Sequence, residues 1–334
     1  MNSKKHGGPT GLLVMAYGTP EAMEGVRPYL THIRHGHEPS DEAVEDLKHR
    51  YGLIGGPSPL YQTTVDQMKA LEERLNALGG DYRGYLGMKH WNPYIPEAVK
   101  GMAADGVERA VAITLAPHYS TMSIAQYLNY VREGLSGIDR PLDIVCVKSY
   151  HDELFFIDAL EEKLREAMVA VPADQREDIP VVFTAHSLPE KILKADDPYR
   201  EQLLDTSRLV AERFGGMNWR FAFTSQGETK DKWLGPTLAE TFHQLAAEGH
   251  KAVMCCTVGF VSEHLETLFD FDIEGKQDAE ERGLTFYRAA ALGTSPKYIA
   301  ALADVVRKAE AGDSGVETAR LPEDDLQAPT YPTY

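Results

Sequence analysis

The chain has 334 residues, 43% of them hydrophobic, which is the composition of an ordinary globular protein long enough for two core-forming domains. Its formal net charge of −17 disfavours nucleic acids and acidic membrane surfaces as partners but leaves metal cations open. It has no apolar stretch long enough for a signal peptide or a membrane span, and its three cysteines lie in apolar runs without C-x-x-C spacing (Cys146, Cys255, Cys256). We therefore expect a soluble cytoplasmic protein with reduced cysteines.

Short apolar or β-branched runs alternate with segments of helical periodicity along most of the chain. The predicted strands are residues 11–17, 83–87, 109–116, 142–149, 180–186, 220–225 and 251–258. Helical patterns lie at 60–78, 94–105, 121–135, 152–170, 199–214 and 236–248. Strands that are apolar throughout and are separated by helices are typical of a parallel sheet covered on both faces. The sequence thus predicts an α/β fold of two doubly wound, Rossmann-like domains, each a parallel sheet flanked by helices.

We divide the chain into an N-terminal domain at 1–160, with a polar excursion at 20–60, and a C-terminal domain at 161–310. The last segment, 311–334, is rich in acids and poor in large aliphatic residues, so we expect a flexible tail. Ligands of doubly wound sheets bind where the carboxyl ends of the strands open into loops. Polar side chains follow several predicted strands, so they are expected to meet at one edge (Tyr17, Lys89, His90, His186).

The usual motifs for several enzyme classes are missing. The sequence has no G-x-x-x-x-G-K-[ST], no G-x-G-x-x-G after a strand, no H-E-x-x-H and no G-x-S-x-G. Phosphoryl transfer, hydride transfer and triad hydrolysis therefore lack their usual sequence support, and histidine and carboxylate chemistry remains.

Residues 262–275, SEHLETLFDFDIEG, carry four acids at helical spacing, opposite an apolar stripe (Glu263, Glu266, Asp270, Glu274). This pattern is typical of the solvent-facing side of a surface helix; the alternative is a row of oxygen ligands and proton acceptors for a cation. His186 at a strand end has both a structural and a catalytic interpretation. If His186 and Glu266 share a crevice, they form a base beside a carboxylate that can remove protons and receive a divalent metal.

The excursion contains a cluster of basic residues within 27–51. It is either an ordinary charged helical segment or an anion clamp, because arginine, tyrosine and serine together bind carboxylates well. The members of the predicted clamp are Arg34, Arg50, Tyr51 and Ser58.

Eight segments together resemble one family, the ferrochelatases: LLVMAYGTP, THIRHG, RYGLIGGPSPL, GMKH, LAPHYST, TAHSLPEKI, DKWLGP and VGFVSEHLETLFDFDIE. The resemblance extends from about residue 11 to residue 308, and it is strongest to the water-soluble bacterial members that insert iron into coproporphyrin III. The resemblance implies a two-domain chelatase fold with a four-stranded sheet in each domain and porphyrin in the cleft between them. It also implies a lyase of haem biosynthesis whose substrates are Fe²⁺ and a porphyrin.

The resemblance also implies roles for individual residues. His186 and Glu266 match the catalytic pair, and Asp270 and Glu274 match an acidic row that passes metal or protons. Tyr17 matches a residue on the far face of the macrocycle that can touch the iron. The implied metal contacts are therefore His186, Glu266, Asp270, Glu274 and Tyr17, and the implied porphyrin contacts are Tyr17, Arg34, Arg50, Tyr51, Ser58, Lys89, His90 and Tyr127.

Three departures from other family members refine the expectation. His35 stands where relatives often have a second arginine beside Arg34, which weakens one propionate contact or makes it pH-dependent. The lip between the first strand and the GG-x-SP segment is short and polar, which favours a soluble enzyme for the four-carboxylate substrate. No cysteines cluster near the C-terminus, so we expect no [2Fe–2S] cluster and no permanently bound cofactor.

Three alternatives stay open at this point. The chain could serve protoporphyrin IX, or it could be a chelatase for another tetrapyrrole or metal, such as cobalt in a sirohydrochlorin. The third alternative is a non-catalytic porphyrin or haem carrier. We further expect a monomer that makes at most transient contact with neighbouring enzymes of the haem pathway and binds neither nucleic acid nor membrane.

Overall fold

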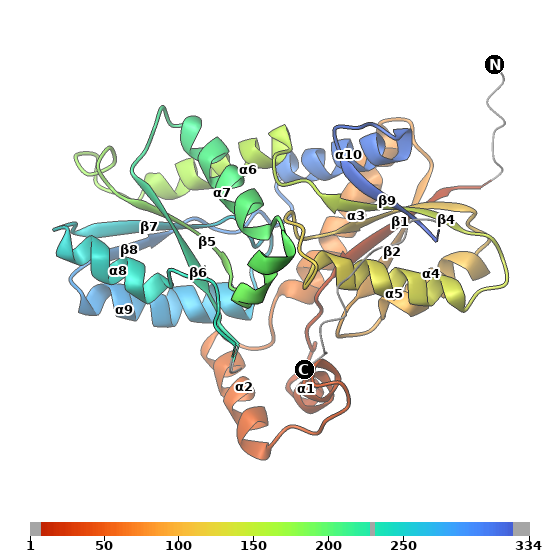
Figure 1. Ribbon diagram of the computed structural model, residues 1–334, viewed down its shortest axis with the longest axis horizontal. Coiled ribbons are helices and arrows are strands. Elements are labelled where there is room, and N and C mark those ends of the chain that lie inside the picture. Colours follow the sequence, from red (N-terminus) through yellow and green to blue (C-terminus); the bar gives the residue numbers. More distant parts are fainter. Residues whose placement is uncertain (1–7, 228–230, 323–334) are drawn as a thin grey trace.

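The computed structural model describes residues 8–227 and 231–322, which form two parallel-dominated sheets lying end to end (Figure 1). The first sheet has the order β2-β1-β3-β4-β9. Its strands are β1 (Thr10–Ala16), β2 (Tyr82–Met88), β3 (Arg109–Thr114), β4 (Asp143–Ser149) and β9 (Glu317–Leu321). The first four strands are parallel, and β9 pairs antiparallel with β4 at the edge, so the four-stranded sheet that the resemblance implies is wrong for this half, which has five strands.

The second sheet has the order β6-β5-β7-β8, and all its pairs are parallel. Its strands are β5 (Val181–His186), β6 (Trp219–Thr224), β7 (Ala252–Thr257) and β8 (Thr285–Arg288). The seven predicted strands therefore exist, with bounds that differ by one or two residues. The edge strands β8 and β9 escaped prediction because neither is a continuous apolar run.

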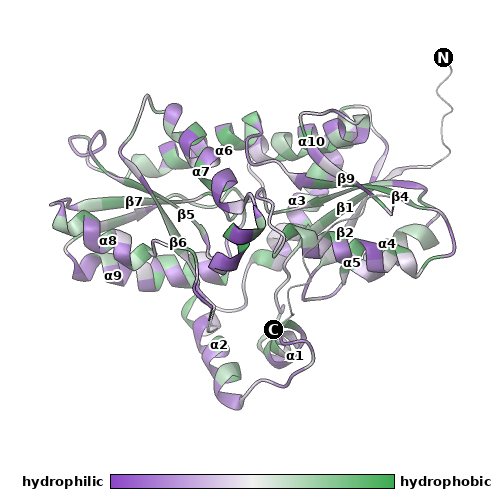
Figure 2. Ribbon diagram, in the orientation of Figure 1, coloured by the Kyte–Doolittle hydropathy of each residue, from purple (hydrophilic) through white to green (hydrophobic). Residues whose placement is uncertain are grey.

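Helices cover both faces of each sheet, and the alternation of side chains along the strands decides which face each residue serves. In β1, Leu13 and Met15 pack with α4 (Ile95–Ala104) and α5 (Ile124–Ser136). Leu12 and Val14 point to the opposite face, toward α3 (Leu60–Ala77). Figure 2 shows the apolar strands enclosed by helices whose outer sides are polar.

One hydrophobic core runs through both sheets. It contains Leu12 of β1 and Phe183 of β5, joined through α6 (Leu154–Met168), α7 (Tyr199–Glu212) and α10 (Pro296–Ala311). The far side of the second sheet has a separate core beneath α8 (Leu238–Ala247) and α9 (Lys276–Glu281). The shared core indicates that the two sheets are packed as one body.

The C-terminal part of the chain returns to the first sheet. Helix α10 packs against α3 and β4, and β9 follows it into the sheet. The prediction of a flexible tail from residue 311 is therefore wrong for residues 317–321, where alternate residues Ala319 and Leu321 are buried. Residues 323–334 of that predicted tail lie outside the described residues. The division of the chain at 160/161 stays a prediction; that point falls inside α6.

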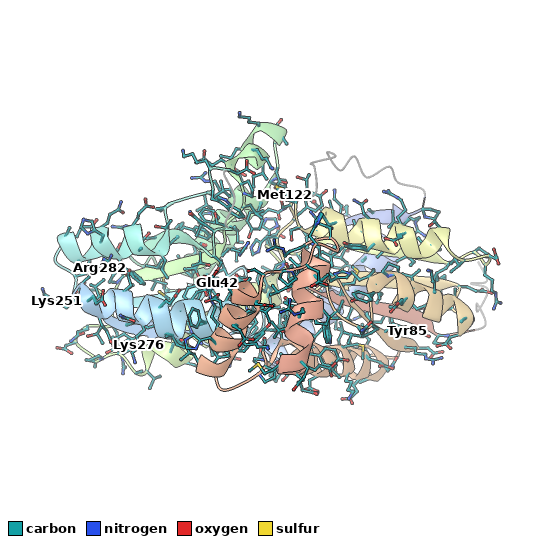
Figure 3. The ribbon with its side chains drawn as sticks, turned by 90° about the horizontal axis from the view of Figure 1, so that it is seen from below. Glu42, Tyr85, Met122, Lys251, Lys276 and Arg282 are labelled. Carbon is teal, nitrogen blue, oxygen red and sulfur yellow. The ribbon has the colours of Figure 1, made fainter. Side chains whose placement is uncertain are left out.

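The excursion at 20–60 forms a short 3-10 turn (Met23–Gly25) and two helices, α1 (Val26–Ile33) and α2 (Asp41–Leu53). They project from the junction of the sheets (Figure 1), and in the view from below, with Glu42 labelled, they lie in front of that junction (Figure 3). Val26, Val44 and Tyr51 form a small core of their own, against which Leu265 of the second half packs. The excursion thus bridges the two halves.

The acidic segment is helical, but its geometry differs from the prediction. Residues Glu266–Gly275 form a π-helix, not an α-helix, and it continues directly into α9. Glu263 lies before this helix and binds Arg288, so it does not extend the acidic row. A π-helix has i→i+5 hydrogen bonds and a wider turn than the α-helix that 100° periodicity assumes, and such segments are frequent at functional sites.

Among the described residues, no helix is both long and apolar enough to cross a membrane.

A buried polar network joins the loops after β3 and β4 to the second half of the chain. The Asp197 carboxylate, 4% exposed, accepts hydrogen bonds from Ser120 Oγ at 3.0 Å, Thr121 N at 2.7 Å and Thr121 Oγ1 at 2.6 Å. On α7, the side-chain oxygen of Gln202 accepts a bond from the amide of Tyr119 at 2.8 Å. Buried donors of this kind are costly to leave unpaired, so the network fixes how the halves meet.

We predict that Asp197→Ala lowers the free energy of unfolding by about 3 kcal/mol, because it leaves several buried donors without an acceptor. Urea denaturation monitored by circular dichroism measures the change. Asp174→Ala, at an exposed aspartate, serves as the control and should change stability by less than about 0.5 kcal/mol. Equal stability of the two variants would show that the network does not hold the halves together.

Candidate active site

The first feature of the site is a histidine–glutamate pair that the fold assembles from two distant segments. His186 is the last residue of β5, and Glu266 begins the π-helix. His186 Nδ1 and Glu266 Oε2 are 3.0 Å apart, within hydrogen-bond distance. The two side chains are 37% and 34% exposed, so the pair is open to solvent on one side. The predicted convergence of these residues is therefore present in the structure.

The environment of the pair raises the pKa of the histidine and lowers the pKa of the glutamate. Burial by itself lowers the pKa of His186, but the charge of Glu266 and its hydrogen bond outweigh burial, and the pKa is raised above the ordinary histidine value. Burial favours the neutral acid at Glu266, yet the charge and hydrogen bond of His186 lower its pKa to about 2. Near neutral pH the glutamate is a stable anion, and the imidazole beside it is a stronger proton acceptor than a free histidine.

Neighbouring groups fix the orientation of His186. Its backbone carbonyl accepts a hydrogen bond from the hydroxyl of Tyr199 at 3.0 Å. Its ring meets Trp233 edge to face, with centroids 6.4 Å apart. The residues before it in β5, Thr184 and Ala185, are fully buried, so the strand carries the histidine out of the core at its carboxyl end.

The acidic row continues from Glu266 to Asp270 and Glu274 along the π-helix. Ser225 donates a hydrogen bond to the Asp270 carboxylate from a left-handed backbone conformation, with φ of 57°. Burial, together with the charges of Glu266 and Glu274, raises the pKa of Asp270 to about 6, despite that hydrogen bond. Asp270 can therefore exchange a proton near physiological pH, whereas Glu266 cannot. Glu274 is exposed at the outer end of the row.

A second group of side chains comes from the first sheet. Tyr17 follows β1, is 42% exposed, and lies 4.6 Å from the ring of His90 between centroids. Lys89 Nζ lies 5.5 Å from the Tyr17 ring and 5.6 Å from the Tyr127 ring, and it donates to Gln126 at 2.5 Å. These contacts confirm that the residues after β1 and β2 meet at one edge.

The electrostatics of this group follow from burial. Burial lowers the pKa of Lys89 to about 8. Burial also lowers the pKa of His90 to about 2, and the neighbouring charges of Lys89 and His32 add to this shift. His90 is thus neutral, and its Nδ1 lies 3.1 Å from His32 Nδ1. The pKa of Tyr17 is raised mainly by burial and, to a smaller extent, by the charge of Glu266. The first group and the histidine–glutamate pair are therefore close enough to interact electrostatically.

The residues of the predicted anion clamp differ in how far they are exposed to solvent. Arg34 is exposed at the end of α1. The Arg50 guanidinium lies 5.2 Å from the centroid of the Phe269 ring of the π-helix, and its Nε pairs with Asp46 at 3.0 Å. Tyr51 and Ser58 are buried. Tyr51 shares a hydrogen bond with Thr19 Oγ1 at 3.0 Å, and Ser58 Oγ accepts one from the amide of Leu60 at 3.3 Å. Arg34 is therefore exposed and Arg50 partly exposed, whereas Tyr51 and Ser58 are buried and hydrogen-bonded within the protein.

The described residues contain no group of three or more histidine, cysteine, aspartate or glutamate side chains placed to hold a metal ion. His186 and Glu266 together offer one nitrogen and one carboxylate, and Asp270 follows one step along the helix.

Sequence reasoning missed three residues that support the site: Ser225, Tyr199 and Trp233. Each acts through tertiary contact with His186 or Asp270, so periodicity gives no signal for it.

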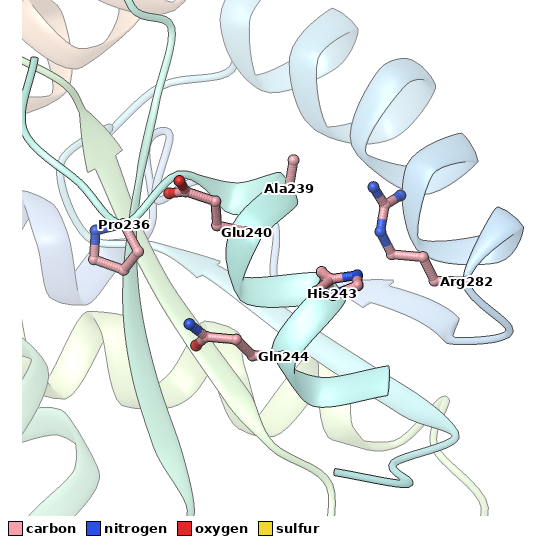
Figure 4. A pocket seen from close by; sticks show the side chains of 6 residues that line it. All are labelled: Pro236, Ala239, Glu240, His243, Gln244 and Arg282. Atoms are coloured by element: carbon pink, nitrogen blue, oxygen red, sulfur yellow. The ribbon is translucent and has the colours of Figure 1, made fainter. Parts of the chain in front are cut away.

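A hollow of about 500 Å³ lies elsewhere, between α8 and α9, and is lined by Pro236, Ala239, Glu240, His243, Gln244 and Arg282 (Figure 4). None of the predicted site residues lines it.

Solved structures of similar fold include two of the protein SirB. SirB from Bacillus subtilis with Fe³⁺ superposes with a TM-score of 0.56 at 12% identity, covering 92% of this chain and 98% of that one. The sirohydrochlorin chelatase SirB from Bacillus subtilis subspecies spizizenii, in complex with cobalt, gives 0.53 at 10% identity, covering 92% and 97%. The fold is therefore that of the two-domain chelatases.

The family follows from sequence similarity. The ferrochelatase family model matches residues 9–310, and the chain belongs to the ferrochelatase family. The coproporphyrin III ferrochelatase of Geobacillus sp. (strain WCH70) is 46% identical over 301 residues, which is 89% of this chain and 97% of that protein. The ferrochelatase of Deinococcus radiodurans is 40% identical over 302 residues, or 90% of this chain and 96% of that protein.

The raised pKa of Asp270 has a consequence for stability. The folded protein keeps the Asp270 proton up to about pH 6, whereas the unfolded chain releases it near pH 4, so this group lowers stability as pH rises through that window. We predict that Asp270→Asn raises the free energy of unfolding by about 1–3 kcal/mol at pH 8 and has no effect near pH 4.

Urea denaturation across this pH range measures the difference. Asp272→Asn is the matched control two residues away, and it should destabilise the protein at pH 8 because Asp272 binds Arg288 through both carboxylate oxygens. A constant effect of Asp270→Asn from pH 4 to pH 8 would contradict the assignment of a raised pKa.

Proposed function

We propose that the protein inserts Fe²⁺ into coproporphyrin III to give iron coproporphyrin, with His186 and Glu266 as the catalytic pair. The observation that carries the proposal is the solvent-open contact of 3.0 Å between His186 Nδ1 and Glu266 Oε2, within electrostatic reach of Tyr17. Membership of the ferrochelatase family and similarity to coproporphyrin III ferrochelatases over about nine-tenths of the chain support it.

The reaction exchanges two protons for one cation. Each of two pyrrole nitrogens releases the proton of its N–H bond, and Fe²⁺ exchanges its water ligands for the ring nitrogens. His186 accepts the two protons one after the other and passes on the first before it receives the second, because the adjacent carboxylate stabilises the imidazolium that forms each time. Glu266 stays ionised, and Asp270, with a pKa of about 6, accepts each proton in turn and releases it toward Glu274 and solvent.

The N-terminal group supplies the opposite wall of the proposed porphyrin cleft. Tyr17 presents an aromatic ring and a hydroxyl that stays protonated because its pKa is raised, so it can contact the metal or the ring face without adding charge. Lys89, which burial has brought to a pKa of about 8, supplies a cation for a propionate. Arg34 and Arg50 supply two more, which suits a substrate with four carboxylates.

We propose that the protein holds no resident cofactor and acts as a monomer in the cytoplasm. Its three cysteines are buried core residues of β4 and β7, and burial raises the pKa of each thiol (Cys146, Cys255, Cys256). Such thiols are poor ligands for an iron–sulfur cluster. The iron is a substrate and not a resident cofactor.

We predict that His186→Ala lowers kcat for iron insertion by at least ~100-fold, because the general base is lost, while the Kd for coproporphyrin III changes less than ~3-fold. Anaerobic insertion followed by absorbance and binding followed by porphyrin fluorescence measure the two quantities. His243→Ala, at an exposed histidine of α8, is the control and should keep the parental kcat. Full turnover in His186→Ala would remove this residue from its role; binding without turnover in the unaltered protein would identify a porphyrin carrier.

A second prediction concerns the choice of substrate. We expect kcat/KM for coproporphyrin III to exceed that for protoporphyrin IX by ~10-fold or more, because one additional charge-assisted hydrogen bond to a propionate is worth about 1.5 kcal/mol. Matched assays with both porphyrins measure the ratio, and Arg34→Ala should reduce it. Equal or inverted values would identify a protoporphyrin enzyme, and turnover of cobalt with sirohydrochlorin alone would place the protein with the other tetrapyrrole chelatases.

A further inference from the structure

Arg288, the last residue of β8, lies at the centre of an ion cluster that the proposed reaction does not use. Its Nε and Nη2 reach the two carboxylate oxygens of Asp272, each at 2.6 Å, and its Nη1 donates to Glu263 Oε1 at 3.0 Å. The same Glu263 oxygen accepts the amide of Ala291 at 2.8 Å. The Arg288 side chain is only 10% exposed, so this cluster is more than a surface ion pair.

The two carboxylates that Arg288 binds stand on either side of the catalytic acids. Glu263 precedes the π-helix by three residues, and Asp272 lies inside it, two residues after Asp270. One guanidinium therefore ties together the entrance and the middle of the segment that carries Glu266 and Asp270. The strand that supplies it, β8, is hydrogen-bonded to β7 and belongs to the rigid sheet.

This segment needs an external restraint. Ten consecutive residues in π-helical geometry are unusual, since such turns occur mostly singly within α-helices. Like charges four residues apart, at Glu266, Asp270 and Glu274, further oppose the helix. A change from i→i+5 to i→i+4 bonding would rotate Asp270 relative to Glu266 and would alter where both point.

We propose that Arg288 is a positioning residue of the insertion site: by binding Glu263 and Asp272, it holds the π-helical segment so that Glu266 faces His186 and Asp270 faces Ser225. The inference rests on the proposed function for its kinetic consequence, but its structural content is independent of that function. Arg288 touches neither substrate nor metal, and it acts only through the two carboxylates.

The test compares Arg288→Lys with Asp272→Asn. Lysine keeps the charge but cannot form the two-pronged contact with Asp272 while reaching Glu263. We expect kcat for iron insertion to fall about 10- to 100-fold in both variants, with KM for coproporphyrin III within ~3-fold, because the catalytic groups are displaced and porphyrin binding is kept. The double variant should be no worse than the poorer single one, because both changes break the same contact.

Arg282→Lys is the matched control. Arg282 pairs with Asp278 within α9 and lies beside the α8 hollow (Figure 4), on the outer side of the second half in the view from below (Figure 3). It should keep kcat within ~2-fold of the unaltered protein. If Arg288→Lys does not fold, Asp272→Asn alone decides the question, because it leaves Arg288 and its bond to Glu263 in place.

Hydrogen–deuterium exchange separates this inference from the proposed function. The amides of residues 266–275 should exchange at least ~10-fold faster in Arg288→Lys and Asp272→Asn, and their acceleration should exceed any that lower global stability causes in the other segments. Unaltered kcat in folded variants, or acceleration spread over the whole chain, overturns the positioning role. If the unaltered protein inserts no iron, the proposed function fails, and local exchange at 266–275 alone then supports or overturns the restraint by Arg288.

Discussion

The contact between His186 and Glu266 is the constraint on which the arrangement of this protein depends. A histidine and a glutamate eighty residues apart share a hydrogen bond of 3.0 Å and remain about one-third exposed. Each depends on the other for its charge, since burial by itself favours the neutral form of both. The pair therefore requires rigid support on both sides, which β5 provides for the histidine and the π-helix for the glutamate.

Repulsion between the carboxylates of residues 263–274 is the main electrostatic cost of building such a site. His186 lies within hydrogen-bond distance of Glu266, burial and neighbouring charges raise the pKa of Asp270 to about 6, and Arg288 binds both Glu263 and Asp272. Five acids lie within residues 263–274, and four of them have such a partner or a raised pKa: Glu263, Glu266, Asp270 and Asp272. As a result the pKa rises along the π-helix: Glu266 stays ionised near neutral pH, whereas Asp270 can exchange a proton.

The rest of the fold holds the two walls of the site at a fixed separation. The continuous core through α6, α7 and α10 joins the sheets, and the network around Asp197 fixes the loop that follows β3. The excursion adds a third bridge, because its small core contacts Leu265 directly before Glu266, and Arg50 packs on Phe269. A flat substrate bound between Tyr17 and His186 would thus meet walls that are supported from several directions.

The sequence by itself determined the α/β class, the seven buried strands and the residues at their carboxyl ends, because apolar runs and their spacing are local properties. The resemblance to ferrochelatases supplied the residue roles, and family membership is confirmed. Only the tertiary structure decided the rest: that residues 317–321 join the first sheet, that the acidic segment is a π-helix, that Tyr51 and Ser58 are buried, and that Glu263 binds Arg288. The physical reason is that these features arise from contacts between distant segments, where the burial of a strand edge or of a charge outweighs the local preference that periodicity can detect.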